Sequence, residues 1–421
     1  GHMNIICAYT VNLDAVHDLK GEEIAALPEG AGEAEPKICE KITGLNDLVS
    51  SLLFCMRNGS GAELLIERDD VARMIGTSFS WHHRLGGNAG IMANVLAARG
   101  AMPVLNAPAL SRRMAGMLHP GVRLPLQGKL VEPVQAADEK EMVHFVFEFA
   151  AGTAVKTRQN EVVARKSNRL IATFDPFNSR LCTNPDFDSF CSENTRSFDG
   201  ALISGFHLLP FSGFREIYEQ KIAQIASWRE GNPELYIHAE MGSFQRPEMM
   251  KYLVARLPAD SLGLNEDELA MICGPTFGWR RTLESAMLLM RSFGLQRVAV
   301  HTRDYILSVM LDLIPVEEEA KALTSGADAA AALASTGSME GKLPVGVNPL
   351  GIKARNEFIG EGATPSDRGA FLACGEAIAT LVPSLLVDHP KFTVGLGDTA
   401  TATIFHEELK ARIKEKKRHA Y

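Results

Sequence analysis

The stretch ALISGF…VAVHT, residues 201–302, indicates the fold class of the chain. It holds four short apolar runs that are typical of strands: ALISGF (201–206), LYIHAEM (235–241), SLGLN (261–265) and VAVHT (298–302). Helical periodicity lies between them, over 214–230, near 247–256 and over 280–292. Because strands that alternate with helices pair in parallel through crossover connections, we predict an α/β fold with a doubly wound sheet flanked by helices.

The first half of the chain shows a second pattern. A strand is predicted at NIICAYTV (4–11), and a helix over 45–57 that ends at Asn58-Gly59. A glycine turn, RLGGNAG (84–90), leads into a second helix. From 142 to 171 strand-like alternation replaces helical periodicity, and we predict a small antiparallel sheet there.

Composition excludes several classes of partner. The chain has 421 residues, a formal net charge of -8 and 46% hydrophobic residues, which is typical of a globular protein. This acidic balance gives no electrostatic reason to expect nucleic acid or an anionic membrane. Dispersed cysteines without a CxxC pair predict reduced thiols in the cytoplasm rather than a disulfide framework or a zinc site. No apolar run reaches the roughly 18 to 20 residues that a membrane span needs.

Polar residues follow several of the strand-like runs. In an open parallel sheet, ligands bind at the carboxyl ends of the strands, so these positions are candidate site residues. They are Asn12 and Asp14; Gly86, Gly87 and Asn88; His238 and Glu240 with Asn265 and Glu268; and Gly395, Gly397 and Asp398. Each group also has a purely structural explanation: a helix cap for Asp14, a plain turn for Gly86-Gly87, and an interior side chain for His238.

The segment TVGLGDTATATIF (393–405) is the most informative of these positions. TVGL is strand-like, Gly-Asp gives a tight turn, and the threonines begin a helix whose free N–H groups can bind phosphate oxygens. Beside such an anion site, Asp398 can accept a proton from a hydroxyl nucleophile. The alternative is that Asp398 only caps the helix.

Together these segments resemble one family, the ADP-dependent glucokinases and phosphofructokinases, a branch of the ribokinase-like sugar kinases. The resemblance covers nearly the whole chain and rests on AYTVNLDAV (8–16), RLGGNAGIMANVL (84–96), FEFAAGT (147–153), NRLI (168–171), LISGF (202–206), HAEMGS (238–243), DSLGLNEDEL (260–269), VHT (300–302) and TVGLGDT (393–399). It implies a large ribokinase-like domain over 4–14, 42–119 and 176–421. It also implies a smaller, mainly β lid over 15–41 and 120–175, with sugar and nucleotide meeting between the two.

The resemblance also assigns roles around the phosphoryl group. Asp398 would be the general base, and Gly395 and Gly397 would form the anion hole with the amides that lead into the helix. Arg169 would neutralise phosphate charge, with Arg165 as a second candidate. Glu240, Asn265 and Glu268 match the HxE and NxxE motifs and would act on Mg²⁺ through water. The nucleotide-binding candidates are His301, Asn348 and Gly397.

The predicted sugar-binding residues lie upstream. Asn12 and Asp14 would hold sugar hydroxyls together with Gly87 and Asn88, although this chain has Gly-Gly-Asn where the family commonly has Gly-Gly-Gln. Glu63 falls where the glucokinases carry a glutamate that contacts glucose. The alternative for Glu63 is an exposed loop carboxylate.

The resemblance implies transfer of the β-phosphoryl group of ADP to a hexose hydroxyl, with AMP as product. We predict glucose, because residues 150–154 lack the lysines and arginines of the phosphofructokinases and Glu63 would repel a sugar phosphate. Lys156 and Arg158 leave fructose 6-phosphate, or both sugars, as an alternative. Two further alternatives are a catalytically silent sugar-binding protein of this fold and a related kinase that uses ATP. The expected partners are the small-molecule sugar and ADP, and the expected state is a monomer or small homo-oligomer.

Overall fold

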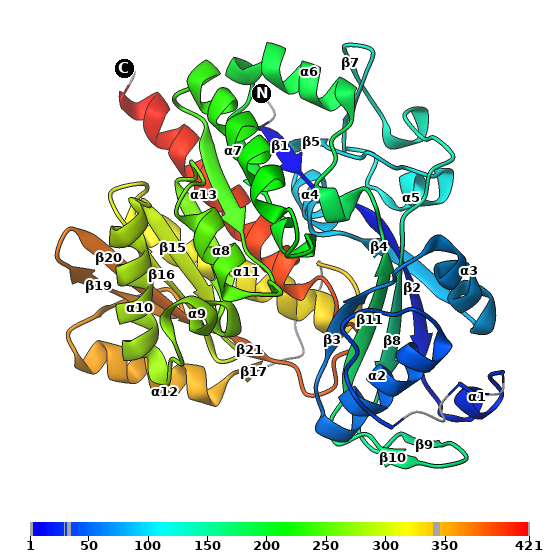
Figure 1. The fold of residues 1–421 in the computed structure, drawn as a ribbon. Coiled ribbons are helices and arrows are strands. Elements are labelled where there is room, and N and C mark those ends of the chain that lie inside the picture. Colours follow the sequence, from blue (N-terminus) through cyan, green and yellow to red (C-terminus); the bar gives the residue numbers. More distant parts are fainter. Residues whose placement is uncertain (1–2, 29, 32–34, 340–345, 420–421) are drawn as a thin grey trace.

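The computed structural model describes residues 3–28, 30–31, 35–339 and 346–419 (Figure 1). Its larger sheet has ten strands within this described part, in the order β18-β19-β20-β16-β15-β14-β13-β12-β1-β5. The six strands from β5 to β15 are parallel, and the four beyond them pair antiparallel. The bounds are β1 (Asn4–Ala8), β5 (Met102–Leu105), β12 (Gly200–Ile203), β13 (Tyr236–Glu240), β14 (Ser261–Asn265), β15 (Arg297–His301), β16 (Tyr305–Met310), β18 (Thr364–Ser366), β19 (Gly369–Cys374) and β20 (Ala377–Pro383).

Helices cover both faces of this sheet, because neighbouring strand residues point to opposite sides. In β1, Ile5 and Cys7 join a core with the helices of one face, while Ile6 and Ala8 join the core of the other. The first face carries α4 (Asn88–Ala98), α11 (Val316–Thr336) and α13 (Leu396–His419). The second carries α6 (Pro185–Glu193), α7 (Phe214–Gly231), α8 (Pro247–Val254), α9 (Glu266–Cys273), α10 (Gly278–Phe293) and α12 (Pro349–Gly360) (Figure 1). The predicted doubly wound architecture is confirmed.

A smaller sheet lies beside the larger one, in the order β3-β11-β8-β2-β4 (Figure 1). We predicted antiparallel pairing here, but the sheet is mixed: β2 with β8 and β3 with β11 are parallel. The hydrophobic side of the sheet packs against α2 (Leu45–Asn58) and α3 (Asp69–Ser78). Its strands are β2 (Asn12–Asp18), β3 (Ala62–Leu65), β4 (His82–Gly86), β8 (Val143–Phe149) and β11 (Asn168–Phe174), and the hairpin of β9 (Ala154–Lys156) and β10 (Glu161–Val163) connects β8 to β11.

The division into two parts differs from the predicted one in two places. Residues 42–86 contribute β3 and β4 to the smaller sheet, although we assigned them to the larger domain. Residues 120–142, assigned to the lid, form the hairpin β6 (Leu124–Leu126) and β7 (Lys129–Val131), and β6 contacts β5 and α6 of the larger part. Strand partners far apart in the chain decide these memberships, and local periodicity does not report them.

Two predicted strands also differ. We predicted one strand over 4–11, with Asn12 and Asp14 following its end. Instead β1 stops at Ala8, and Asp14 lies inside β2 of the smaller sheet. The segment AVHDL (15–19), considered as a helix that Asp14 would cap, also lies mainly in β2. TVGL (393–396) is not a strand either, since it pairs with none of the described strands and α13 already begins at Leu396. Asp398 therefore lies within the first turn of α13 rather than at its N-cap.

The remaining elements are short. They are α1 (Glu22–Ala25), α5 (Arg112–Met117) and the two-stranded pair β17 (Gly346–Val347) and β21 (Leu385–Leu386). Part of the acidic segment 20–40 lies outside the described residues. Among the helices that the structure describes, none combines the length and apolar character that crossing a membrane requires.

Candidate active site

Asp398 meets Asn88 where two helices begin. Gly87 is the N-cap of α4, and the Asn88 Nδ2 atom donates a hydrogen bond to Asp398 Oδ1 over 2.9 Å. Gly395, with φ at +76°, precedes α13, and its carbonyl accepts from the amide of Thr399. The free N–H groups of both helix starts give this place a positive electrostatic character that suits an anion.

The carboxyl group of Asp398 is set up to exchange a proton near neutral pH. Its pKa is raised to about 7. Burial raises it most, the hydrogen bond from Asn88 lowers it, and the negative charges of Glu240 and Asp14 raise it. A carboxylate with such a pKa is a suitable general base. The hydrogen bond also brings the glycine turn at 84–90 into contact with the segment 393–405, although Asn88 and Asp398 are 310 residues apart in the chain.

Four of the predicted sugar-binding residues, Asn12, Asp14, Gly87 and Asn88, lie on β2 and at the turn that follows β4. Asn12 Nδ2 donates to Asp14 Oδ1 over 2.8 Å, and β2 pairs these residues with Gly86 and Arg84 of β4. A side chain at Gly86 would collide with both of them. Gly87 has φ at +84°, and a Cβ atom there would lie 2.6 Å from the Cα of Val11. The two glycines therefore let the turn approach Asn12 and Asp14 closely.

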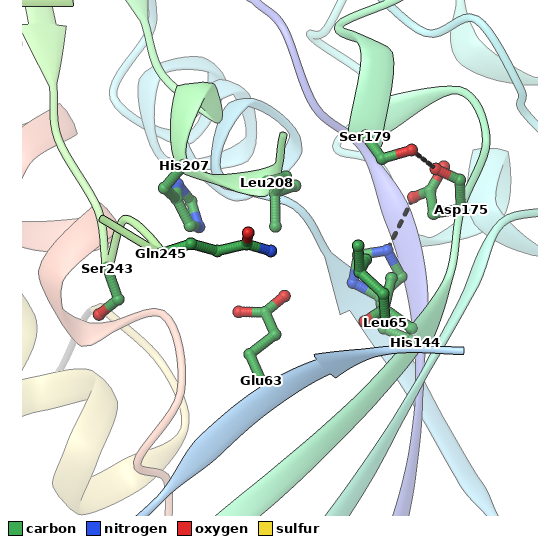
Figure 2. A pocket seen from close by; sticks show the side chains of 10 residues that line it. Glu63, Leu65, His144, Asp175, Ser179, His207, Leu208, Ser243 and Gln245 are labelled. Carbon is green, nitrogen blue, oxygen red and sulfur yellow. Dashed lines mark hydrogen bonds and ion pairs between the residues drawn. The ribbon is translucent and has the colours of Figure 1, made fainter. Parts of the chain in front are cut away.

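Glu63 lies on β3, not on a loop, and its carboxylate points into a pocket between the two parts (Figure 2). Across this pocket Figure 2 shows His207 and Gln245 from the larger part. None of the described residues that line it is a lysine or an arginine. They are Glu63, Leu65, His144, Thr173, Asp175, Ser179, His207, Leu208, Ser243 and Gln245.

His144 is a site residue that the sequence did not single out. It pairs in register with Asp14 between β8 and β2, and its Nε2 atom lies 2.7 Å from Asp175 Oδ2. Burial lowers the pKa of His144, but the hydrogen bond and charge of Asp175, with the charges of Asp14 and Glu63, raise it overall. The only sequence signal was a polar residue in the apolar strand VHFVFEF, and its meaning depended on strand pairing.

Three carboxylates, those of Glu240, Glu268 and Asp398, lie near the carboxyl end of the larger sheet. Glu240 ends β13, and Asn265 and Glu268 form a reciprocal cap at the start of α9: Asn265 Oδ1 accepts from the Glu268 amide, and Glu268 Oε2 accepts from the Asn265 amide. The pKa of Glu268 is raised to about 8. Burial raises it most, the hydrogen bond from the Asn265 amide lowers it, and the charges of Glu240, Asp267 and Asp398 raise it. The NxxE motif thus caps α9 and also places the carboxyl group of Glu268 near the other two carboxylates.

This arrangement fits magnesium in one particular way. The mutual repulsion of Glu240, Glu268 and Asp398 is what a nearby cation would relieve. Within the described residues, no group of three or more acidic, histidine or cysteine side chains is close enough to hold a metal directly. The oxygen atoms of Glu240, Asn265 and Glu268 are donors that suit a hard cation such as magnesium.

His238 connects Glu240 to the interior of the sheet. Its Nε2 atom lies 2.9 Å from Glu240 Oε2, and its Nδ1 atom lies 2.7 Å from Ser261 Oγ. The pKa of His238 is lowered to about 3, because burial and the charge of Arg297 lower it more than the charge of Glu319 raises it. His238 is therefore neutral, and the prediction of an interior histidine is compatible with its contact to the motif glutamate.

The remaining predicted residues are more dispersed. Arg169 lies on β11 and lines a cleft of about 1110 Å³ opposite the segment 388–393 that leads toward Gly395. Arg165 is not among the residues that line this cleft. His301 ends β15 in register with Asn265, at the carboxyl edge of the sheet. Asn348 caps α12, and its side chain also donates to Asp304 over 3.1 Å.

Comparison with known proteins identifies the family. The family model for the ADP-specific phosphofructokinase/glucokinase conserved region matches residues 3–407. The chain belongs to this family. An ADP-dependent glucose/glucosamine kinase of Pyrococcus furiosus is 28% identical, across 96% of this chain and 94% of that protein. An ADP-specific phosphofructokinase of Pyrococcus abyssi is 29% identical, across 96% of each.

Solved structures give the same answer for the fold. A hypothetical ADP-dependent phosphofructokinase from Pyrococcus horikoshii superposes with a TM-score of 0.80 at 26% identity, covering 97% of this chain and 98% of that one. The chain thus has the α/β fold of the ADP-dependent phosphofructokinases and glucokinases. Because relatives named for either sugar match at nearly the same identity, the choice of sugar depends on the chemistry of the pocket.

Proposed function

We propose that this kinase transfers the β-phosphoryl group of ADP to glucose, giving glucose 6-phosphate and AMP. The observation that carries the proposal is the position of Asp398, held by Asn88 between two helix starts and next to the Asn12–Asp14 pair. A base, an anion site and a set of hydroxyl acceptors are what phosphoryl transfer to a sugar requires.

In this proposal each group has a separate task. Asp398 accepts the proton of the attacking hydroxyl, and the amides that follow Gly395 and Gly397 bind the oxygens of the transferred group. Arg169 neutralises phosphate charge from the smaller sheet. Glu240 and Glu268, with Asn265, hold magnesium through water, and the ion when bound supplies positive charge to the phosphates. His301, Asn348 and Gly397 are the proposed nucleotide contacts.

Glucose is favoured by the charge of the pocket that contains Glu63. A sugar phosphate is a dianion and needs cationic partners, whereas a neutral sugar needs hydrogen-bonding groups only. The described lining offers Glu63, His144, His207 and Gln245, and no lysine or arginine. A carboxylate in this place accepts hydrogen bonds from sugar hydroxyls and repels a phosphate group.

One observation favours fructose 6-phosphate as a second candidate. Besides the acidic residues Asp18, Glu148 and Asp388, the cleft at Arg169 is lined by three further basic side chains, those of Lys20, His389 and Lys391. These side chains are equally suited to the phosphates of ADP and to the phosphate of a sugar. The second candidate therefore depends on which of the two anions they bind.

A coupled assay that crosses ADP and ATP with glucose and fructose 6-phosphate, in the presence of magnesium, tests the proposal. We expect turnover with ADP and glucose. Turnover with ATP alone would overturn the assignment of the donor, and a clear preference for fructose 6-phosphate would overturn that of the sugar. Binding of glucose without turnover under any combination would identify a silent sugar-binding protein.

A further inference from the structure

A chain of hydrogen bonds runs from the buried core of the larger sheet to the carboxylate of Glu240. Arg297 Nη1 donates to Ser261 Oγ over 3.1 Å, Ser261 Oγ lies 2.7 Å from His238 Nδ1, and His238 Nε2 lies 2.9 Å from Glu240 Oε2. The residues lie on three adjacent parallel strands, β13, β14 and β15. From Arg297 to His238 the chain of hydrogen bonds crosses the sheet in register, and its last link, from His238 to Glu240, runs along β13.

The inner end of this chain is fixed. Arg297 is 1% exposed, and its guanidinium contacts the carboxylates of Glu319 over 2.7 Å and Glu408 over 2.7 Å. Glu408 in turn accepts a hydrogen bond from the Tyr236 hydroxyl over 2.7 Å. These carboxylates come from α11 and α13 and hold the guanidinium from the first face of the sheet. Arg297 is thus held from two helices.

The direction of each hydrogen bond follows from the donors available. A guanidinium only donates, so Ser261 Oγ accepts from Arg297 and its single hydrogen is free to point to His238 Nδ1. Nδ1 then accepts, and the ring proton lies on Nε2, where it is donated to Glu240. The opposite tautomer would break the hydrogen bond from Ser261 to His238 and set the Nε2 lone pair against the Glu240 carboxylate.

We propose that Ser261 and Arg297 are positioning residues, which select the Nε2–H tautomer of His238 and thereby hold the Glu240 carboxylate in one orientation. The consequence for magnesium rests on the proposed function, in which Glu240 acts on the ion. Oriented hydrogen bonds carry the effect of Ser261 through His238 to Glu240, so Ser261 can influence the site without contacting the substrate.

The tautomer is tested by nuclear magnetic resonance on the full chain labelled with ¹⁵N-histidine. His238 is assigned as the signal lost in the variant His238→Gln. We expect the Nε2–H pattern in the parent and a mixture of tautomers in Ser261→Ala. A parent with the Nδ1–H pattern, or an unchanged pattern in Ser261→Ala, would overturn the proposal. This measurement needs neither magnesium nor turnover.

The effect on the ion is tested with Mn²⁺ as a paramagnetic substitute, titrated in the presence of ADP. We expect Ser261→Ala to weaken binding by about tenfold, in the range found when a partner of a metal-site residue is removed. Ser261→Thr, which keeps the hydroxyl, restores the parent affinity. Ser308→Ala is the matched control, because Ser308 is equally buried in the same sheet and lies outside the chain of hydrogen bonds. Equal weakening in both alanine variants would overturn the proposal.

The variant Glu240→Gln separates this inference from the proposed function. If it leaves Mn²⁺ binding unchanged while the histidine spectra show the expected tautomer, the magnesium role of Glu240 fails and the positioning of its carboxylate stands. If Glu240→Gln weakens Mn²⁺ binding and Ser261→Ala changes neither the spectra nor the affinity, the positioning role fails and the magnesium role stands. Glucose binding, measured by calorimetry, is expected to stay at the parent affinity in every Ser261 variant.

Discussion

As the proposed general base, Asp398 must lose its proton before it can accept one from a sugar hydroxyl. Its pKa of about 7, raised mainly by burial, means that the ionised fraction falls about tenfold for each pH unit below this value. We therefore expect log(kcat/KM) to rise with a slope of about one up to pH 7 and then to level off, since this parameter reports the free enzyme. The check is a profile between about pH 5.5 and 8.5.

The same profile distinguishes Asp398 from other titrating groups. Asp398→Asn keeps the size of the side chain but has no titrating carboxyl, so its residual rate is expected to fall by about 10² to 10⁴-fold and to lose the slope. A parent profile that stays flat down to about pH 5.5 would contradict the assignment of Asp398 as the base.

Glu63 is expected to determine the preference between the two sugars. Its carboxylate points into the pocket lined by His207 and Gln245 (Figure 2), where it can accept hydrogen bonds from hydroxyls. Removing a hydrogen bond to a charged group costs about 1.5 to 3 kcal/mol, so Glu63→Ala should raise the KM for glucose about tenfold or more. The KM for fructose 6-phosphate should change little. Equal effects on both sugars would show that Glu63 lies outside the sugar site.

The glycine turn before α4 limits which residues are tolerated there. Gly87 combines a positive φ with a close approach to Val11, whereas Gly100, after the same helix, has a similar φ of +86° and open space within 4 Å of the place where a Cβ atom would stand. We expect Gly87→Ala to lower the free energy of unfolding by about 2 kcal/mol or more, and Gly100→Ala by about 1 kcal/mol. Urea denaturation of both variants measures the difference. Equal losses would mean that backbone conformation alone, not the contact with Val11, restricts the turn.

The cap of α9 allows helix stability and ion binding to be separated. Asn265→Ala removes the side chain that accepts from the Glu268 amide and should cost about 1 kcal/mol of unfolding free energy. Asn265→Ser keeps a capping oxygen and should retain the stability, but it moves the oxygen away from the proposed ion. A raised magnesium requirement in both variants would support a role beyond capping. A requirement raised only in Asn265→Ala would assign the motif to helix stability.

The two sheets enclose the site from both sides, so substrate binding should change their relative position. The cleft beside Arg169 is lined by β8 and β11 of the smaller sheet and by residues 388–393 of the larger part. Phosphates bound between them would attract Arg169 and Lys391 and draw the two parts together. We expect the radius of gyration in small-angle X-ray scattering to decrease when glucose and a non-hydrolysable ADP analogue are added together. An unchanged radius would contradict closure.

The structure brings predicted site residues into contact most directly where one motif contains them. The pair Asn265 and Glu268 interact over three positions, and Gly395 and Asp398 share one helix start, so local spacing is sufficient to relate them. His144 was missed, because its relation to Asp14 and Asp175 depends on the pairing of β8 with β2 and on the segment after β11. The segment 42–86 was misassigned for the same reason.

The alternation of strands and helices and the order of the motifs, and hence the family and its reaction, can be read from the sequence alone. These features depend on backbone sterics and side-chain periodicity over a few residues, which a linear sequence records directly. Folding in three dimensions was needed to show that Asn88 holds Asp398, that the smaller sheet is mixed, and that burial brings the pKa of Asp398 near neutrality. Such features depend on contacts between segments distant in the chain and on the exclusion of water, and they exist only once the chain has folded.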